Sequence, residues 1–554
     1  MSVPTDHTTA PVVSEESMRS YAEQTGVCAR PLLRRLIDTD TGDVTVVPLP
    51  CGSTREYVCT ACAGKARRLR MQQLAEGWHR DTEPERPASR DEADLADDED
   101  QGDEQAEDSS RRVRSTRRRQ DAVDLPRCPV EDRTIGQTWT GNNGQTYRPS
   151  MFVTLTLPSY GKVHRNGAPV NPGTYDYRRA ALDALHLPKA FDRWMTCLRR
   201  GAGYKVQYFA AIETQRRLAG HLHLAIRGAI PRQTIRQVTA ASYVQVWWPA
   251  HEDSDVRYPG DGPRDTEAGL LPTWDGEHYI DPVTGDRLPT WDQALDRLGR
   301  ACEVDPSTPP AHVARFGTQV DIKGLHADSP DVDRSVRYLT KYLTKSLAHT
   351  HAATDEVTGR PVLDAQLEAH VDRLHAVLRF LPCSPSCSNW LRYGVQPKNA
   401  GPGLVPGMCP AAAHDRENAG LGGRRVLVSR DWTGKTLTQH RADRAAVIRE
   451  VLEAAGVDPD ASLDARRCAA DQVHEDGTPR FRWEPVDRDR DTGLDYVHAI
   501  VIAAQERAER RAQYDAAKRA LGLDLRALIH GPGRSLGPPG GACGQPFDNS
   551  DQAA

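Results

Sequence analysis

Two tyrosines, Tyr338 and Tyr342, stand four residues apart, and a lysine follows each of them three residues later, at Lys341 and Lys345. In a helix, residues at this spacing share one face, about 6 Å apart along the axis. A phenol has a pKa of about 10, so it attacks well at neutral pH only where a cation or metal favours the phenolate. We therefore predict two tyrosine nucleophiles supported by two lysines. The alternative is a Tyr/Leu stripe that packs a helix on a sheet, with solvated lysines.

A His-Leu-His triplet precedes the tyrosines in the chain. On a strand, His221 and His223 point to one side because successive side chains alternate between faces. Glu213 lies eight residues before His221, on the preceding strand of an expected hairpin, where its carboxylate would stand beside both rings. Two imidazoles and a carboxylate suit Mg²⁺ or Mn²⁺, so these three residues are the predicted metal triad, with Gln215 a weaker substitute. The alternative is a pair of surface histidines.

Together, a metal-bound phosphate and a tyrosine nucleophile predict the cutting of a nucleic-acid strand. In-line attack by a phenol on a phosphodiester would join the tyrosine to the 5′ phosphate and release a 3′-hydroxyl. A second tyrosine on the same helix face could attack a second junction while the first remains bonded. The residue pattern therefore supplies the parts needed to cut a DNA strand and keep hold of its end.

Twelve cysteines predict metal ligation rather than disulfides, because the sequence shows neither a signal peptide nor a membrane-spanning apolar run and we expect a cytoplasmic protein. Two groups have the spacing of structural zinc ligands: Cys28, Cys51, Cys59 and Cys62 in the first, and Cys383, Cys387, Cys409 and His414 in the second. A thioredoxin-like redox pair is the alternative for the first group, although no βαβ pattern surrounds it.

A basic, aromatic run, NWLRYGVQPK, lies between the second and third ligands of the second cysteine group. Two interpretations of this run stay open. It could contact the DNA backbone and stack on exposed bases. Equally, the whole group could be a clip that only stabilises the fold.

The net charge of −5 hides an uneven distribution. Residues 81–110 hold 14 acidic and 2 basic side chains, so the remainder of the chain carries +7, a weak indication of a polyanionic partner. Acidic and arginine blocks with few aromatic or β-branched residues predict a disordered linker over 81–127. For its acidic half, a solvated spacer is favoured over a mimic of nucleic acid.

The segments just described resemble the HUH endonucleases, and specifically the two-tyrosine rolling-circle initiators such as the gene A proteins of small single-stranded DNA phages. The resemblance narrows to actinobacterial plasmid initiators of the RepSA type over roughly 28–78 and 128–440. It is carried by FVTLTLPSYG, AGHLHLAIRG, RFGTQVDIKG, RYLTKYLTKS, NWLRYGVQPK and GGRRVLVSRDWTGKTL. It implies that Glu213, His221 and His223 hold the metal and that Tyr338 and Tyr342 are the nucleophiles. Conjugative relaxases carry the tyrosine before the histidines, the reverse of the order here.

The function that this resemblance implies is a metal-dependent DNA nicking and strand-transfer endonuclease that starts rolling-circle replication of a plasmid or integrative element. Its expected partners are single-stranded and duplex origin DNA, a host DNA polymerase and, since no G-x-x-x-x-G-K-[ST] phosphate loop is present, a host helicase, with no membrane partner. The alternatives are a mobilisation relaxase and a non-catalytic, zinc-containing DNA-binding regulator.

The order of elements between 151 and 350 is strand, helix, two strands, helix, insertion, strand and helix, which predicts an α+β fold. We expect a central antiparallel sheet with helices on one face, as in an HUH or ferredoxin-like nuclease. Within it, 232–248 should be helical, 312–325 a single strand, and the repeated Thr-Trp-Asp of the insertion a hairpin with exposed aromatics.

At 554 residues, the chain is too long for one core and should divide into several parts. The expected parts are a disordered leader (1–27), a four-cysteine zinc module (28–80), the disordered linker (81–127), a nuclease domain (128–352, with the insertion at 253–300), a helix with a CCCH zinc module (353–440), a helical C-terminal region (441–530) and a disordered tail (531–554).

Overall fold

The computed structural model divides the chain into two compact units, one made of 1–51 with 441–554 and the other of 52–440. The residues it describes are 14–78, 80, 82–84, 116–120, 125–140, 146–147, 149–260, 262–326, 330–341, 343, 353–354, 361–362, 364–423, 425–456, 474, 477–486 and 493–521. The predicted tail and residues 1–13 of the predicted leader lie outside these ranges. In the remainder of the leader, Glu15–Thr25 form helix α1, so the expectation of a disordered leader is wrong there. Within them, no helix combines the length and the apolar character needed to cross a membrane.

The first unit brings the two ends of the chain together in one antiparallel sheet of order β17-β1-β2. Its elements are α1 (Glu15–Thr25), β1 (Leu32–Asp38), β2 (Val44–Leu49), most of α10 (Leu437–Ala454), β17 (Phe481–Pro485) and α12 (Gly493–Ala520). Met18 and Ala22 of α1 pack against Ile500 and Ala504 of α12. The unit therefore joins parts of the sequence that we expected to fold separately, because strand pairing between β1 and β17 leaves no trace in local composition.

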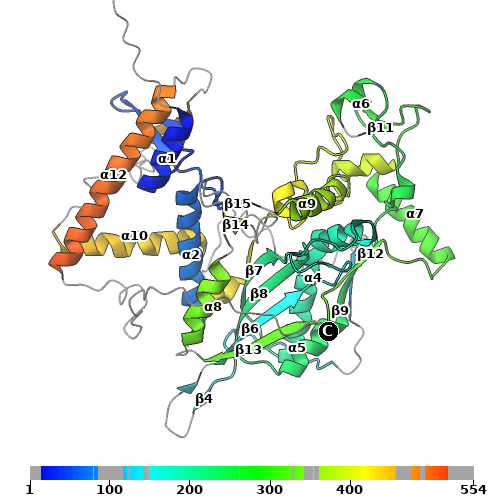
Figure 1. Ribbon diagram of the computed structural model, residues 1–554, viewed down its shortest axis with the longest axis horizontal. Coiled ribbons are helices and arrows are strands. Elements are labelled where there is room, and N and C mark those ends of the chain that lie inside the picture. Colours follow the sequence, from blue (N-terminus) through cyan, green and yellow to red (C-terminus); the bar gives the residue numbers. More distant parts are fainter. Residues whose placement is uncertain are drawn as a thin grey trace, which may run out of the picture. The chain divides into compact units, whose positions relative to one another are not determined.

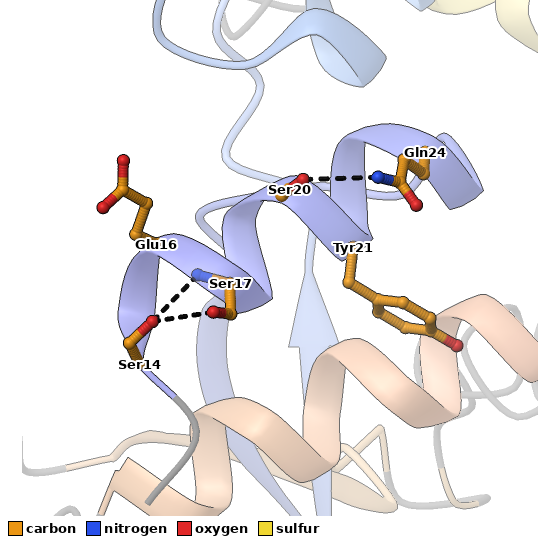
Figure 2. A pocket seen from close by; sticks show the side chains of 6 residues that line it. All are labelled: Ser14, Glu16, Ser17, Ser20, Tyr21 and Gln24. Atoms are coloured by element: carbon orange, nitrogen blue, oxygen red, sulfur yellow. Dashed lines mark hydrogen bonds between the residues drawn. The ribbon is translucent and has the colours of Figure 1, made fainter.

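A shallow depression lies along α1 in the first unit (Figure 2). It is lined by Ser14, Glu16, Ser17, Ser20, Tyr21 and Gln24. Its hydrogen bonds run along the helix itself: the Ser17 N–H donates to Ser14 Oγ at 3.2 Å, and Gln24 Nε2 donates to Ser20 Oγ at 3.4 Å. Because every lining residue comes from one helix and its cap, we do not assign chemistry to this depression.

The second unit is built on a five-stranded antiparallel sheet of order β13-β6-β8-β7-β16, whose strands run side by side (Figure 1). In chain order its elements are α2 (Thr60–Trp78), β3 (Thr116–Gln120), β4 (Trp139–Thr140), β5 (Thr146–Tyr147), β6 (Pro149–Thr156), α4 (Tyr177–Ala202), β7 (Tyr208–Thr214), β8 (Gly220–Arg227), α5 (Arg232–Ala241), β9 (Ser242–Val246), α6 (Pro263–Glu267), β10 (Thr273–Trp274), β11 (Tyr279–Ile280), α7 (Trp291–Val304), β12 (His312–Ala314), β13 (Val320–His326), α8 (Pro330–Lys341), β14 (Ala353–Thr354), β15 (Pro361–Val362), α9 (Ala365–Leu378) and β16 (Val426–Val428). An α+β fold with an antiparallel sheet is thus confirmed.

Helices cover both faces of this sheet, so the expectation of helices on one face is wrong. On one face, Leu222 and Leu224 of β8 join the large core that includes Phe191 and Trp194 of α4. On the other, Ala225 of β8 packs in a smaller cluster with residues of α2 and α8. The prediction failed because α2 precedes the expected nuclease segment, and its place on the sheet depends on long-range contacts.

Helix α2 approaches the sheet too closely for any side chain at Gly77. A Cβ atom there would lie 2.3 Å from the indole of Trp432. The buried Arg227 guanidinium of β8 donates through Nε to the Gly77 carbonyl oxygen at 3.0 Å, which satisfies a carbonyl at the end of the helix. These contacts fix α2 over the same sheet face that carries the histidines.

A second sheet, of order β12-β9-β3, corrects two expected elements. The predicted helix over 232–248 ends at Ala241, because the following SYVQV is rich in β-branched and aromatic residues and forms β9, in which every second side chain is buried. The predicted strand over 312–325 divides into β12 and β13, which belong to different sheets. The chain turns between them near Gly317, whose N–H donates to the Thr156 carbonyl.

Part of the expected disordered linker is ordered. Strand β3 pairs with β9 over Thr116–Gln120, and Glu83 accepts hydrogen bonds from the N–H and hydroxyl groups of Thr134. An edge strand requires backbone pairing but no apolar side chains, so the composition of the arginine run did not reveal it. The remainder of the linker, apart from a few residues at its two ends, lies outside the described ranges.

Only one of the two Thr-Trp-Asp repeats of the insertion forms a hairpin. Strands β10 and β11 pair at Trp274 and Tyr279, but Trp291 begins α7 and is buried against Trp390. The expectation of exposed aromatics is therefore wrong, since both tryptophans pack into apolar clusters.

Buried histidines predict that acid will destabilise the second unit. Burial lowers the pKa of His251 and of His370 to about 4. Between pH 6.5 and 4 the unfolded chain therefore binds protons that the folded chain does not, and stability falls as the pH falls. For His251 alone the loss is on the order of 3 kcal/mol. Urea unfolding followed by tryptophan fluorescence reports mainly on this unit, which holds nine of the ten tryptophans.

A pair of variants tests the assignment to burial. His251→Gln should make the free energy of unfolding less dependent on pH between 6.5 and 4. His164→Gln, at an exposed histidine, should leave that dependence unchanged. Equal pH profiles for the wild type and His251→Gln would contradict the prediction.

Candidate metal and nucleophile site

The hairpin of β7 and β8 sets the predicted metal ligands side by side. Its register places Glu213 directly opposite His221, and strand alternation puts His223 on the same face one pair further along. Arg217 in the connecting turn donates to the carbonyl oxygens of Leu157 and Pro158, each at 2.9 Å, which ties the hairpin to the end of β6. The site is therefore carried by paired strands rather than by a loop.

Donor atoms of Glu213, His221 and His223 lie within 4.8 Å of one another. His223 Nε2 is 2.6 Å from Glu213 Oε1, and the two imidazole rings stand nearly perpendicular with centroids 4.4 Å apart. Glu213 and His223 are 7% and 6% exposed, so a carboxylate and an imidazole are held together away from bulk water. A divalent cation would neutralise that carboxylate and be bound by both imidazoles, so the donor set fits a divalent metal ion.

The first predicted tyrosine reaches this cluster from α8. The Tyr338 hydroxyl lies 3.2 Å from His223 Nε2, and the phenol ring stands edge-on to the His223 imidazole with centroids 4.9 Å apart. Phe152 of β6 contacts both rings from the side. Although the Tyr338 hydroxyl contacts the site, the residue is 40% exposed. It is therefore accessible to a large substrate.

Apolar spacing on α8 explains this orientation. Val336, Leu339 and Leu343 pack against the sheet in the cluster that includes Leu325 of β13. Tyr338 lies at the border of this apolar stripe, where the side chain can leave the core and still reach β8. The helix expected around the first tyrosine is thus confirmed over Pro330–Lys341.

Not every predicted residue of the tyrosine helix can be placed. Tyr342 and Lys345 lie outside the described residues, as does the side chain of Lys341. Arg334, which our sequence reasoning missed, is exposed and lies one turn before Tyr338 on the same helix face. Its spacing of four residues from the tyrosine was the signal that could have identified it as a further cation near the phenol.

Gln215, the weaker substitute ligand, turns its amide nitrogen toward the site. Its Oε1 accepts a hydrogen bond from Arg217 Nε at 2.7 Å, and its Nε2 lies 3.5 Å from His221 Nδ1. In this arrangement the amide oxygen is engaged by Arg217, which leaves Glu213 as the oxygen donor of the cluster.

The second predicted zinc group forms a compact cluster within the second unit. Donor atoms of Cys383, Cys387, Cys409 and His414 lie within 4.8 Å of one another. Tetrahedral zinc would set two sulfurs about 3.8 Å apart and a sulfur and nitrogen about 3.6 Å apart. The Sγ atoms of Cys383 and Cys409 are 4.0 Å apart, and Cys387 Sγ is 3.5 Å from His414 Nε2. These spacings fit a zinc ion.

Hydrogen bonding and charge in this cluster also suit a cation. His414 Nδ1 donates to the Leu378 carbonyl oxygen at 2.8 Å, which leaves Nε2 with the lone pair that a metal needs. Hydrogen bonds from the neighbouring thiols lower the pKa of Cys409, while those to Cys383 and Cys409, with burial, raise the pKa of Cys387. The sulfurs are too close to ionise together unless a cation neutralises them.

The first cysteine group is divided between the two units. In the first unit, the Cys51 N–H donates to Cys28 Sγ at 3.3 Å. In the second, Cys59 and Cys62 are buried at the start of α2. A single zinc ion shared by the four cysteines stays a prediction.

The aromatic run of the second cysteine group is largely buried. Trp390 is 0% and Tyr393 6% exposed, and both pack with Trp248 and Trp291. Trp390 Nε1 donates to the Ser384 carbonyl oxygen at 2.9 Å, next to the ligand Cys383. These rings cannot stack on bases without leaving the core, so the fold-stabilising interpretation is favoured.

Comparison with known proteins identifies the family. Residues 14–495 match the family model described as RepSA, the replication initiator protein of pSAM2. The chain belongs to this replication initiator family. The resemblance to RepSA-type initiators, predicted from the sequence motifs, is thereby confirmed.

A replication initiator protein from Streptomyces ambofaciens is 31% identical to this chain over 157 residues, which cover 20% of this chain and 34% of that protein. The chain thus spans about a third of the length of the curated relative. No solved structure matches this chain, so its fold rests on the geometry described above.

Proposed function

We propose that this replication initiator nicks one strand of a plasmid or integrative-element origin through Tyr338, with the site of Glu213, His221 and His223 as its metal centre. One observation carries the proposal: the Tyr338 hydroxyl lies 3.2 Å from His223 Nε2. This contact joins the proposed nucleophile to a proposed metal ligand 115 residues away in the sequence. A packing tyrosine would have no need to leave the apolar stripe of α8 for this polar cluster.

Each residue has a defined role in the proposed step. The two imidazoles and the carboxylate would hold a divalent ion, which would supply charge neutralisation at the scissile phosphate. The Tyr338 oxygen forms a bond to phosphorus, and the bond from phosphorus to the 3′ oxygen breaks. The phenol proton passes to solvent, and the departing 3′ oxygen takes up a proton from solvent to become a hydroxyl. The 5′ phosphate stays joined to the protein, and the 3′-hydroxyl serves as a primer.

Tyr342, Lys341 and Lys345 enter the proposal through their spacing and the family resemblance alone. A helix continuing from α8 would place Tyr342 on the Tyr338 face, where it would serve a second strand transfer. The lysines would stabilise charge on the phosphate and the phenolate.

Initiation of replication also defines the partners that we propose. The resemblance to HUH endonucleases implies an unpaired strand, so the substrate would be the single-stranded part of an origin, with flanking duplex bound elsewhere. A host helicase would extend the opening and a host DNA polymerase would extend the 3′-hydroxyl.

Incubation of the full chain with end-labelled single-stranded origin DNA and Mn²⁺ tests the nicking step. We expect a protein–DNA adduct that survives denaturation and is lost when the ion is chelated. His221→Ala should lower adduct formation at least tenfold because it removes a ligand, with little change in duplex binding. His164→Ala, at an exposed histidine, should behave as wild type.

Two results would count against the proposal. Absence of an adduct despite tight DNA binding would favour the non-catalytic regulator. Loss of plasmid transfer, but not of replication, in a deletion strain would favour a mobilisation relaxase.

A further inference from the structure

Two threonines of β6 stand directly opposite the two histidines of the site. The strand register pairs Thr154 with His223 and Thr156 with His221. Thr154 Oγ1 is 3.0 Å from His223 Nδ1, and Thr156 Oγ1 is 2.7 Å from His221 Nδ1. Both threonines are nearly buried, at 8% and 9% exposed, so each contact is sheltered from water. The same hydroxyl-to-Nδ1 contact is thus made twice, one pair apart on the sheet.

The nitrogen that an imidazole offers to a metal is set by the hydrogen bond at its other nitrogen. With both Nδ1 atoms on hydroxyl groups, Nε2 is left as the ligand atom of each ring. For His223 this atom is the one that faces Glu213 and Tyr338. The threonines thereby favour the ring orientation that a metal centre on this face requires.

A hydroxyl group suits this position because it can either donate or accept. Without an ion, the Thr154 hydroxyl can donate to His223 Nδ1 while Nε2–H donates to Glu213. When an ion takes the Nε2 lone pair, the proton sits on Nδ1 and the same hydroxyl accepts it. Neither arrangement leaves a buried ring nitrogen without a partner, which would be costly.

Other neighbours of the two histidines favour a proton on Nε2, the nitrogen that a metal would need. Glu213 Oε1, only 2.6 Å from His223 Nε2, favours a proton on that nitrogen. Similarly, Gln215 Nε2 approaches His221 Nδ1 at 3.5 Å and, as a donor, would favour a proton on His221 Nε2. Either proton would block the metal-binding lone pair.

We infer that Thr154 and Thr156 are positioning residues that hold the rings of His221 and His223 with Nε2 toward the metal centre and accept the Nδ1 proton once an ion is bound. The inference rests on the proposed function, since it assigns these hydroxyls to the same metal centre. It adds two residues whose replacement would weaken metal binding although neither residue is itself a metal ligand.

The test is the Mn²⁺ affinity of the full chain, measured by calorimetric titration. Comparison with His221→Ala separates binding at this site from binding at the cysteine groups. Thr156→Val keeps the side-chain shape but removes the hydroxyl, and should weaken Mn²⁺ binding 10- to 100-fold, as expected for loss of an outer-shell partner. Thr154→Val should have a similar effect. Thr156→Ser and Thr154→Ser restore the hydroxyl and should return the affinity to within a few-fold of wild type.

Thr234→Val is the matched control, because it removes a similarly buried hydroxyl from α5, away from the histidines. It should leave Mn²⁺ affinity unchanged. Thermal unfolding of each variant shows whether it is folded, and the Ser variants carry the test if a Val variant is not. If His221→Ala abolishes a site that Thr156→Val and Thr154→Val leave intact, or if Ser variants bind as weakly as Val variants, the inference is overturned. If the wild type has no histidine-dependent Mn²⁺ site, the proposed function fails with it.

Discussion

Replacing Tyr338 with Phe should lower formation of the protein–DNA adduct by at least about 10³-fold, because the substitution removes the attacking oxygen and nothing else. The phenyl ring would keep its edge contacts with Phe152 and His223. Mn²⁺ affinity and the temperature of unfolding should therefore stay near wild type. Mass spectrometry of the trypsin-digested adduct should find the nucleotide on the peptide that carries Tyr338.

Two further variants make this result interpretable. Tyr21→Phe changes a tyrosine of similar exposure, 39% against 40%, and should nick normally. Combining Tyr338→Phe with Tyr342→Phe should remove the residual adduct and strand transfer together. Full nicking by this double variant would show that the nucleophile lies elsewhere in the chain.

Loss of the second cysteine cluster should have the largest effect on stability. Cys387→Ser should lower the zinc content by one ion per chain, because it removes a buried thiol of the ligand set that lies 3.5 Å from His414 Nε2. Structural zinc contributes about 10 kcal/mol in small zinc modules, which is comparable to the whole stability of a typical domain. We therefore expect residues near 383–414 to become sensitive to protease, with a large fall in the unfolding midpoint.

Elemental analysis alongside limited proteolysis measures both effects. Cys302→Ser is the control, since this partly exposed cysteine of α7 belongs to neither ligand group. It should retain zinc and resist protease like the wild type. Unchanged zinc content in Cys387→Ser would show that the cluster is not a metal site.

Local patterns predicted the elements that carry the site because those elements are recorded in adjacent residues. Alternation identified the strand around His221 and His223, and the short turn after Glu213 predicted its place in a hairpin. The tyrosine helix was visible from its apolar spacing. For the same reason the family could be recognised before any fold was known.

What the sequence did not reveal depends on partners far along the chain. Helix α2 covers the sheet through Gly77 and Trp432, which are 355 residues apart, and β17 completes a sheet with β1. Nothing in the local sequence distinguishes Thr154 and Thr156 from ordinary strand residues. Their significance appears only once the register of β6 against β8 is known, because single-strand alternation gives a face but not a neighbour.

The prospective ion ligands and the phenol enter the fold by different routes. Glu213, His221 and His223 come from one hairpin of eleven consecutive residues, whereas Tyr338 arrives on a separate helix after a long excursion of the chain. Placing three ligands on a single hairpin costs little loop-closure entropy, and their mutual positions depend only on the register between β7 and β8. Substitutions at the exposed positions of α8 would leave that hairpin intact, whereas its apolar positions pack against the same sheet. The proposed strand transfer could thus be retuned from α8 without rebuilding the proposed cation site.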